Sequence, residues 1–107
     1  MSSARRSAMT LPELLSPALF KALCDPNRIA LLAWLALERK PRTVTDAANA
    51  GCCAVDVSVV SRHLATLRDA GLVVAEKRGK EVFYHVETRD IAARLRKIAS
   101  ALEACCG

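Results

Sequence analysis

Residues 56–86 read DVSVVSRHLATLRDAGLVVAEKRGKEVFYHV, and this stretch decides the fold class. Its first half predicts a helix that Asp56 can cap and that Gly71 can end in a left-handed conformation. Two short apolar strands follow, and the basic turn KRGKE, in which Gly79 permits a tight reversal, separates them. Apolar side chains recur in the helix at helical spacing, and we expect them to face the core: Val57, Val60, Leu64 and Leu67.

The order helix, strand, charged turn, strand predicts a winged helix-turn-helix, a mainly α-helical fold with a small β-hairpin. In such domains one helix enters the major groove of DNA and the hairpin touches the adjacent backbone. The stretch therefore predicts a module that binds double-stranded operator DNA.

The sequence predicts further helices on both sides of this stretch. A first helix fits residues 11–23, and Asp25 caps a second helix. Thr43 or Thr45 opens a short alanine-rich third helix, which Gly51 stops. In the second helix we expect an inward apolar stripe, widened by Trp34 or Leu35, that consists of Ile29, Leu32, Ala33 and Ala36.

The last predicted helix covers about residues 88–105. Its large apolar side chains form one narrow seam, made of Ile91, Leu95, Ile98 and Leu102. A terminal helix with such a seam is suited to pack against its symmetry mate or against the first helix. We therefore expect a dimer that pairs through the first and last helices.

Composition agrees with a small DNA-binding domain. The chain has 107 residues, and its apolar fraction of 52% is high for a small monomer, which favours a dimer interface. The net charge of +5 suits a polyanionic partner. We expect a flexible N-terminus over residues 1–10 and a single DNA-binding and dimerisation domain over residues 11–107. No apolar run approaches the length of a membrane span, and MSSARRSAMT lacks a signal-peptide core, so we expect a cytoplasmic protein with reduced thiols and no membrane partner.

Three stretches of the chain read LFKALCDPNRIALL, VSRHLATLRDAGLV and KRGKEVFYHV. In order and spacing they resemble the ArsR/SmtB family of metal-sensing bacterial repressors, and the resemblance covers about residues 14–104. It implies a homodimer of winged subunits, each with five helices, that represses an operator until an inducer binds.

The resemblance also implies which residues face DNA. The fourth helix becomes the recognition helix, whose candidate DNA-facing residues are Ser58, Val59, Ser61, Arg62 and His63. Arg62 either reads guanine edges or grips a phosphate, and His63 either supports packing or touches DNA. At the turn of the hairpin, Lys77, Arg78 and Lys80 favour contact with the DNA backbone over a merely solvated turn.

The cysteines are Cys24, Cys52, Cys53, Cys105 and Cys106, an odd number in a chain expected to be reduced. They have almost no histidine near them in the sequence, and zinc-type CxxC spacing is absent. Sites made of thiolates alone select soft ions. The sequence therefore predicts that these cysteines bind a soft metal or metalloid inducer.

The chain departs from the family pattern in where its cysteines lie. Familiar arsenite sensors of the family carry Cys-x-Cys at the start of the third helix, where this chain has Thr43, Val44 and Thr45. The family's zinc site on the last helix uses histidines and carboxylates, and this last helix has no histidine. Instead, Cys52 and Cys53 lie in an apparent extension before the recognition helix.

Adjacent side chains of a regular helix point about 100° apart, so neighbouring thiols share one ion only where the helix ends. Cys52 and Cys53 follow a helix-stopping glycine, and we expect the last helix to fray at Cys105 and Cys106. Trivalent arsenic prefers three sulfurs, so either pair needs another thiolate. Cys24 is either that third ligand or a small buried residue at a helix junction; a cysteine of the other pair, from the same or the partner chain, is the alternative.

We expect As(III) or Sb(III) as the inducer, and not as a permanent cofactor; Cd(II), Pb(II), Hg(II) or Cu(I) are alternatives. A thiol redox or persulfide sensor on the same scaffold is a further alternative. We do not expect an enzyme, because neither His63 nor His85 is obviously placed to activate a thiol and no substrate pocket is suggested.

Overall fold

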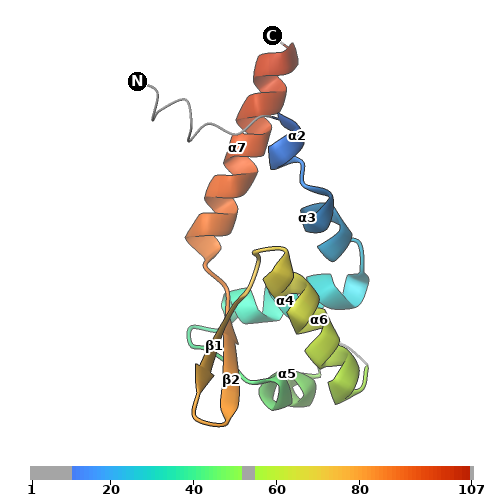
Figure 1. Ribbon diagram of the computed structural model, residues 1–107, viewed down its shortest axis with the longest axis vertical. Helices are drawn as coiled ribbons and strands as arrows, with labels where there is room; N and C mark the ends of the chain where they lie inside the picture. Colours follow the sequence, from blue (N-terminus) through green and yellow to red (C-terminus); the bar gives the residue numbers. More distant parts are fainter. Residues whose placement is uncertain (1–10, 52–54, 107) are drawn as a thin grey trace.

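The computed structural model describes residues 11–51 and 55–106 (Figure 1). None of the described helices is both long and apolar enough to cross a membrane. The elements follow in the order α2 (Leu11–Leu14), α3 (Pro17–Ala22), α4 (Pro26–Leu37), α5 (Val44–Ala50), α6 (Val57–Asp69), β1 (Val74–Arg78), β2 (Glu81–His85) and α7 (Thr88–Cys106).

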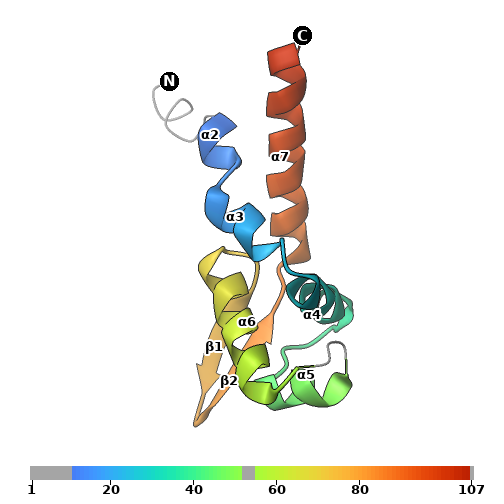
Figure 2. The same cartoon turned by 90° about the vertical axis from the view of Figure 1, so that its right-hand side faces the viewer.

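The structure has two parts. Helices α4, α5 and α6 pack with the β1–β2 hairpin into one body, whereas α7 extends away from that body with α2 beside it (Figures 1 and 2). The two helices α5 and α6, followed by the antiparallel hairpin β1–β2, have the order of a winged helix-turn-helix. The predicted fold class is therefore confirmed.

The N-terminal helical region differs from the prediction of one helix over residues 11–23. It forms two short helices, because the chain breaks at Ser16, whose ψ of 127° is extended. Pro17 causes the break: its ring disfavours helical backbone at the preceding residue, and it has no N–H to continue a helix. Ser16 then caps α3 by accepting a hydrogen bond from the backbone N–H of Leu19.

The predicted start signals of α4 and α5 are confirmed. Asp25 Oδ1 accepts hydrogen bonds from the backbone N–H groups of Asn27, at 2.8 Å, and Arg28, at 3.2 Å. Thr43, rather than Thr45, caps α5 and forms a reciprocal capping box with Asp46. Gly51 ends α5 with φ of 70°, in the left-handed region that favours glycine.

Helix α6 ends as the sequence predicts. The backbone N–H of Leu72 bonds to the carbonyl of Leu67 and that of Gly71 to the carbonyl of Arg68, which together make a Schellman motif. Gly71 has φ of 79°, and Leu72 is buried just beyond it. Arg94 of α7 donates a hydrogen bond from Nη1 to the carbonyl of Ala70, at 2.9 Å, and so ties α7 to this helix end.

The hairpin pairs β1 with β2 antiparallel, with Arg78 opposite Glu81 at the turn. Gly79 has φ of 64°, as the first position of a type II′ turn requires. Tyr84 is buried and exchanges two backbone hydrogen bonds with Arg42, so the segment before α5 forms an isolated antiparallel bridge to β2. The hairpin is thereby fixed to the helical body.

The predicted core of α6 is confirmed at three positions and wrong at one. Val60, Leu64 and Leu67 are almost fully buried, but Val57 is 52% exposed. Val57 occupies the first turn of α6, and its side chain faces solvent although its spacing matches the buried positions. The core comprises Leu14, Leu19, Ala22, Leu31, Leu35, Ala47, Val60, Leu64, Leu67, Ala70, Leu72, Val73, Tyr84 and Ile98.

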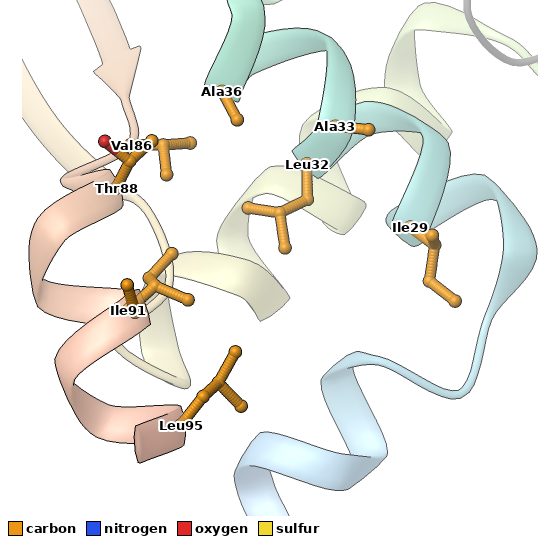
Figure 3. A pocket seen from close by; sticks show the side chains of 9 residues that line it. Ile29, Leu32, Ala33, Ala36, Val86, Thr88, Ile91 and Leu95 are labelled. Carbon is orange, nitrogen blue, oxygen red and sulfur yellow. The ribbon is translucent and has the colours of Figure 1, made fainter. Parts of the chain in front are cut away.

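The predicted inward stripe of α4 is wrong at Ile29, Ala33 and Ala36, whereas Leu32 is partly buried against the core and the suggested Leu35 is buried. The buried residues are Leu31 and Leu35; Ile29, Ala33 and Ala36 are exposed. Because α4 is apolar on nearly every side, periodicity alone does not choose its inner face. The predicted stripe lines an apolar cleft of about 350 Å³ between α4 and the first half of α7 (Figure 3), completed by Val86, Thr88, Ile91, Ala92 and Leu95.

Candidate nucleic-acid interface and thiol sites

Of the predicted DNA-facing residues of α6, three lie on its exposed side. Ser58, Ser61 and Arg62 are exposed, whereas Val59 and His63 are half-buried. The first turn of α6 and the tip of the hairpin lie at the same end of the molecule, away from α7 (Figure 1). The structure therefore brings the polar side of one helix and a basic turn to one end of the molecule.

The three basic residues of the turn differ in their contacts. Arg78 forms an ion pair with Glu76, in which Nη2 lies 3.0 Å from Oε1. The guanidinium carbon of Arg78 also lies 5.0 Å from the centre of the Phe83 ring. Lys77 and Lys80 are exposed, and within the described part of the chain neither takes part in an ion pair. These two lysines are thus the more available for an anionic partner.

Val57, which the sequence prediction assigned to the core, is an additional exposed side chain in the first turn of α6. It lies next to Ser58. An exposed valine there provides a methyl surface of the kind that contacts the thymine methyl group in a major groove. Its place directly after the N-cap Asp56 was the available signal, since the first turn of a recognition helix is the part nearest the bases.

The structure places His63 against Arg28 of α4. Arg28 Nη1 lies 3.3 Å from His63 Nδ1, and the same guanidinium donates from Nε to the carbonyl of Ala22, at 2.8 Å, and from Nη2 to that of Lys21, at 3.0 Å. His63 therefore joins the packing between α6 and the α3–α4 junction, which is one of the two roles expected for it.

Asp25 completes this junction, with Oδ2 at 3.8 Å from Arg28 Nη1. Partial removal from water raises the pKa of Asp25, but the backbone N–H groups of Arg28 and Asn27 and the charge of Arg28 oppose this effect, and the pKa is lowered overall. The ionised cap stabilises α4 above the ordinary pKa of aspartate, and this stabilisation is lost as the pH falls through the lowered value.

Cys24 is an exposed free thiol at the α3–α4 junction. Its Sγ donates a hydrogen bond to the carbonyl of Lys21, at 3.1 Å. The alternative of a small buried residue is therefore wrong, because the side chain of Cys24 faces solvent just after α3 ends. The thiol is accessible to a ligand from outside.

The structure describes the backbone of one cysteine pair and not of the other. Cys52 and Cys53 lie outside the described residues. Cys105 and Cys106 belong to the last turn of α7, so the predicted fraying there is wrong for the backbone up to Cys106. The C-terminal end of α7 and the α5 helix lie at opposite ends of the molecule (Figures 1 and 2). Within residues 11–51 and 55–106, no group of three or more metal-ligating side chains comes together.

His85 had no assigned role, and the structure pairs its Nε2 with Glu87 Oε2 at 2.9 Å. His85 is the last residue of β2, and its described side-chain partner is Glu87, whereas that of Cys24 is the Lys21 carbonyl, so the two are not described as a nucleophile–base pair.

Comparison with known proteins gives consistent matches. A family model described as a helix-turn-helix domain matches residues 23–75. The arsenical resistance operon repressor of Escherichia coli (strain K12) is 40% identical over 75 residues, which are 68% of this chain and 60% of that protein. The chain spans about 60% of the length of the curated relatives it matches.

Solved structures agree in fold. An ArsR-like transcriptional regulator from Rhodococcus sp. RHA1 superposes with a TM-score of 0.62 at 30% identity, over 82% of this chain and 76% of that one. The homodimeric winged helix-turn-helix DNA-binding domain of a possible ArsR-family regulator from Mycobacterium bovis superposes with a TM-score of 0.60 at 27% identity, over 82% of this chain and 75% of that one. These matches are to regulators, in agreement with the prediction that the chain is not an enzyme.

Proposed function

The chain belongs to the ArsR/SmtB family of transcriptional regulators, and from that premise we propose that it is a homodimeric operator-binding repressor released by a thiolate-binding inducer. The observation that carries the proposal is the exposed polar side of α6 beside the basic turn, at one end of the molecule. The proposed site of action is the cytoplasm, where thiols remain reduced.

In this proposal α6 enters the major groove. Arg62 is the residue best suited to read a guanine edge, because its guanidinium is exposed and can bond bidentately. Ser58 and Ser61 donate to phosphates or base edges, and Val59 lies at the margin of the contact. Lys77 and Lys80, with Arg78, contact the adjacent backbone.

The dimer is proposed to form through α2 and α7. Leu95 and Leu102 lie on one side of α7, and they are 50% and 43% exposed in the single chain. The Mycobacterium bovis relative is described as homodimeric, which supports covering this side with a second copy. Two recognition helices then face successive major grooves about 34 Å apart on a palindromic operator.

The proposed inducer is As(III) or Sb(III), held by three thiolates. Cys52 and Cys53 are the favoured pair, with the exposed Cys24 as a third ligand and Cys105 or Cys106, from the same or the partner chain, as alternatives. Two features support a metalloid: the sulfur-rich ligand set and the likeness to an arsenical resistance operon repressor. Cd(II), Pb(II), Hg(II) and Cu(I) suit the same ligands.

Inducer binding is proposed to draw Cys52 and Cys53 toward the third thiolate and so to move the segment that leads into α6. A coupling free energy of about 1–3 kcal/mol loosens operator binding, and nearly complete release needs about 5 kcal/mol. Each As–S bond forms as an As–OH bond breaks, and the thiol proton leaves with that hydroxide as water.

The test is an anisotropy titration of an operator duplex with reduced protein, adding As(III), Sb(III), Cd(II), Hg(II) and an organic polysulfide separately. Release by near-stoichiometric As(III) or Sb(III) is the expected result. The double variant C52S/C53S should keep operator affinity and lose release, whereas C105S/C106S is the matched double substitution at the other pair. Release that persists in C52S/C53S contradicts the site, and release by polysulfide alone, reversed by dithiothreitol, identifies a redox sensor.

A further inference from the structure

The side chain of Arg28, near the start of α4, makes polar contacts with both the α3–α4 junction and α6. Its guanidinium donates to the carbonyls of Ala22 and Lys21, at 2.8 and 3.0 Å, and Nη1 lies 3.3 Å from His63 Nδ1. Only 15% of its side chain is exposed. A half-buried arginine with this set of acceptors is fixed in place and does not reach freely for an external anion.

The contact with His63 has a defined polarity. A guanidinium only donates hydrogen bonds, so a hydrogen bond here requires Nδ1 of His63 to accept, which in a neutral imidazole places the proton on Nε2. His63 lies between the exposed Arg62 and the buried Leu64 in the middle of α6. The guanidinium thus fixes the recognition helix to the carbonyl groups at the end of α3.

The guanidinium of Arg28 and the thiol of Cys24 donate hydrogen bonds to the same carbonyl oxygen. Cys24 Sγ donates to the Lys21 carbonyl, at 3.1 Å, and Arg28 Nη2 donates to that same oxygen, at 3.0 Å. A change at the sulfur that removes its S–H donor leaves this carbonyl with the guanidinium as its remaining side-chain donor. The two hydrogen bonds at Lys21 and the contact with His63 therefore form one connected chain from Cys24 to α6.

We propose that Arg28 is the positioning residue of the recognition helix, holding α6 through His63 and making its orientation sensitive to the state of the Cys24 thiol. This inference rests on the proposed function in taking α6 as the helix that reads DNA. It does not require that the ligand be a metalloid.

The first test measures operator affinity against salt concentration, on a duplex selected from random-sequence DNA. R28Q and R28K should each weaken binding about tenfold, roughly the loss of one hydrogen bond to a charged group. Lysine should fail to substitute, since one ammonium does not reach two carbonyls and an imidazole at once. The slope of log affinity against log salt should stay unchanged, because no phosphate contact is lost. R96Q, at an exposed arginine of α7, removes the same charge as a control.

The second test reads the imidazole directly. Long-range ¹⁵N–¹H correlation spectra should show His63 as the Nε2–H tautomer in the unsubstituted chain and a tautomer mixture in R28Q. H63N keeps an acceptor near the Nδ1 position and should retain affinity better than H63L, which removes it. The His63 variants leave the junction at α3 intact, so they test the contact even if R28Q fails to fold.

The third test concerns Cys24 alone, in a chain whose other four cysteines are serine. Methyl methanethiosulfonate converts the S–H of Cys24 to S–S–CH₃ and releases methanesulfinic acid, which removes the donor to Lys21. The His63 ¹⁵N signals should shift on this treatment, and the shift should be absent in R28Q.

Three results would overturn the proposal: a salt slope lowered by about 0.9 in R28Q, which marks a phosphate contact; wild-type affinity in R28K; or His63 signals insensitive to the Cys24 modification. Failure of As(III) to release DNA, with these three tests positive, would instead count against the proposed inducer alone.

Discussion

Helices α6 and α7 carry similar amphipathic patterns but are packed to different extents. In α6, Val60, Leu64 and Leu67 are almost fully buried against the helical body. In α7, a longer helix of 19 residues, Ile98 is buried while Leu95 and Leu102 remain half-exposed. The difference shows that α6 completes its core within one chain, whereas α7 leaves apolar surface exposed, as the proposed dimer requires.

The apolar cleft between α4 and α7 is a second place where α7 leaves apolar side chains incompletely covered. It lies where α4 faces the first half of α7, and Leu95 contributes both to its lining and to the seam of α7 (Figure 3). The single direct hydrogen bond described between α7 and the end of α6 is that of Arg94 with the Ala70 carbonyl. Replacing Arg94 therefore tests this polar link apart from the apolar contacts between the two parts.

The largest expected effect is on the core of α6. L64A should lower the free energy of unfolding by about 3 kcal/mol, because it leaves a cavity at a fully buried site. V57A, on the exposed first turn of the same helix, should change it by less than about 0.5 kcal/mol. Urea denaturation measures both, and equal losses would show that α6 is not packed on one side only.

The next effect concerns the seam of α7. L95E/L102E should give a folded monomer by sedimentation and reduce operator affinity by about 10²-fold or more, because paired half-site binding is lost. S100E/A104E places two carboxylates on a different side of the helix and should leave a dimer. A dimer that survives L95E/L102E would contradict pairing through this side of α7.

A smaller effect is expected at the hairpin. K77Q/K80Q should reduce the steepness of the salt dependence of operator binding by about 1.8, since each lost phosphate contact contributes about 0.9. R78Q should reduce it less, because Arg78 is already engaged by Glu76 and Phe83. An unchanged slope in K77Q/K80Q would mean that the turn does not touch DNA.

The smallest effect tests the link between the halves. R94M keeps the length of the side chain but removes its hydrogen bond to Ala70, and should cost about 1 kcal/mol in unfolding free energy. The exposed R96M should cost less than about 0.5 kcal/mol. Equal values from urea denaturation would indicate that this link contributes nothing to stability.

Local signals predicted much of the fold because their physics is local. Asp25, Thr43 and Gly71 act through hydrogen bonds or backbone angles within a few residues, and each begins or ends a helix as predicted. The first helix was the exception, although the signal at Pro17 was equally local: a proline after Ser16 breaks the helix there.

The candidate sites were predicted less completely. The exposed side of α6 followed from periodicity, because its buried residues alternate clearly with Ser58, Ser61 and Arg62. The contact of Arg28 with His63 did not, since it joins residues 35 positions apart in the chain. The exposure of Cys24 was likewise undecided until the junction between α3 and α4 was seen.

The sequence by itself determined the order of helices and strands, the caps that bound them, the basic turn and the sulfur-rich set of potential ligands. These depend on interactions between residues close in the chain. Only the tertiary structure decided which side of α4 is buried, that Val57 and Cys24 face solvent, and that Arg28 contacts His63 of α6. The reason is physical: a helix that is apolar on nearly every side has no preferred inner face until other elements pack against it.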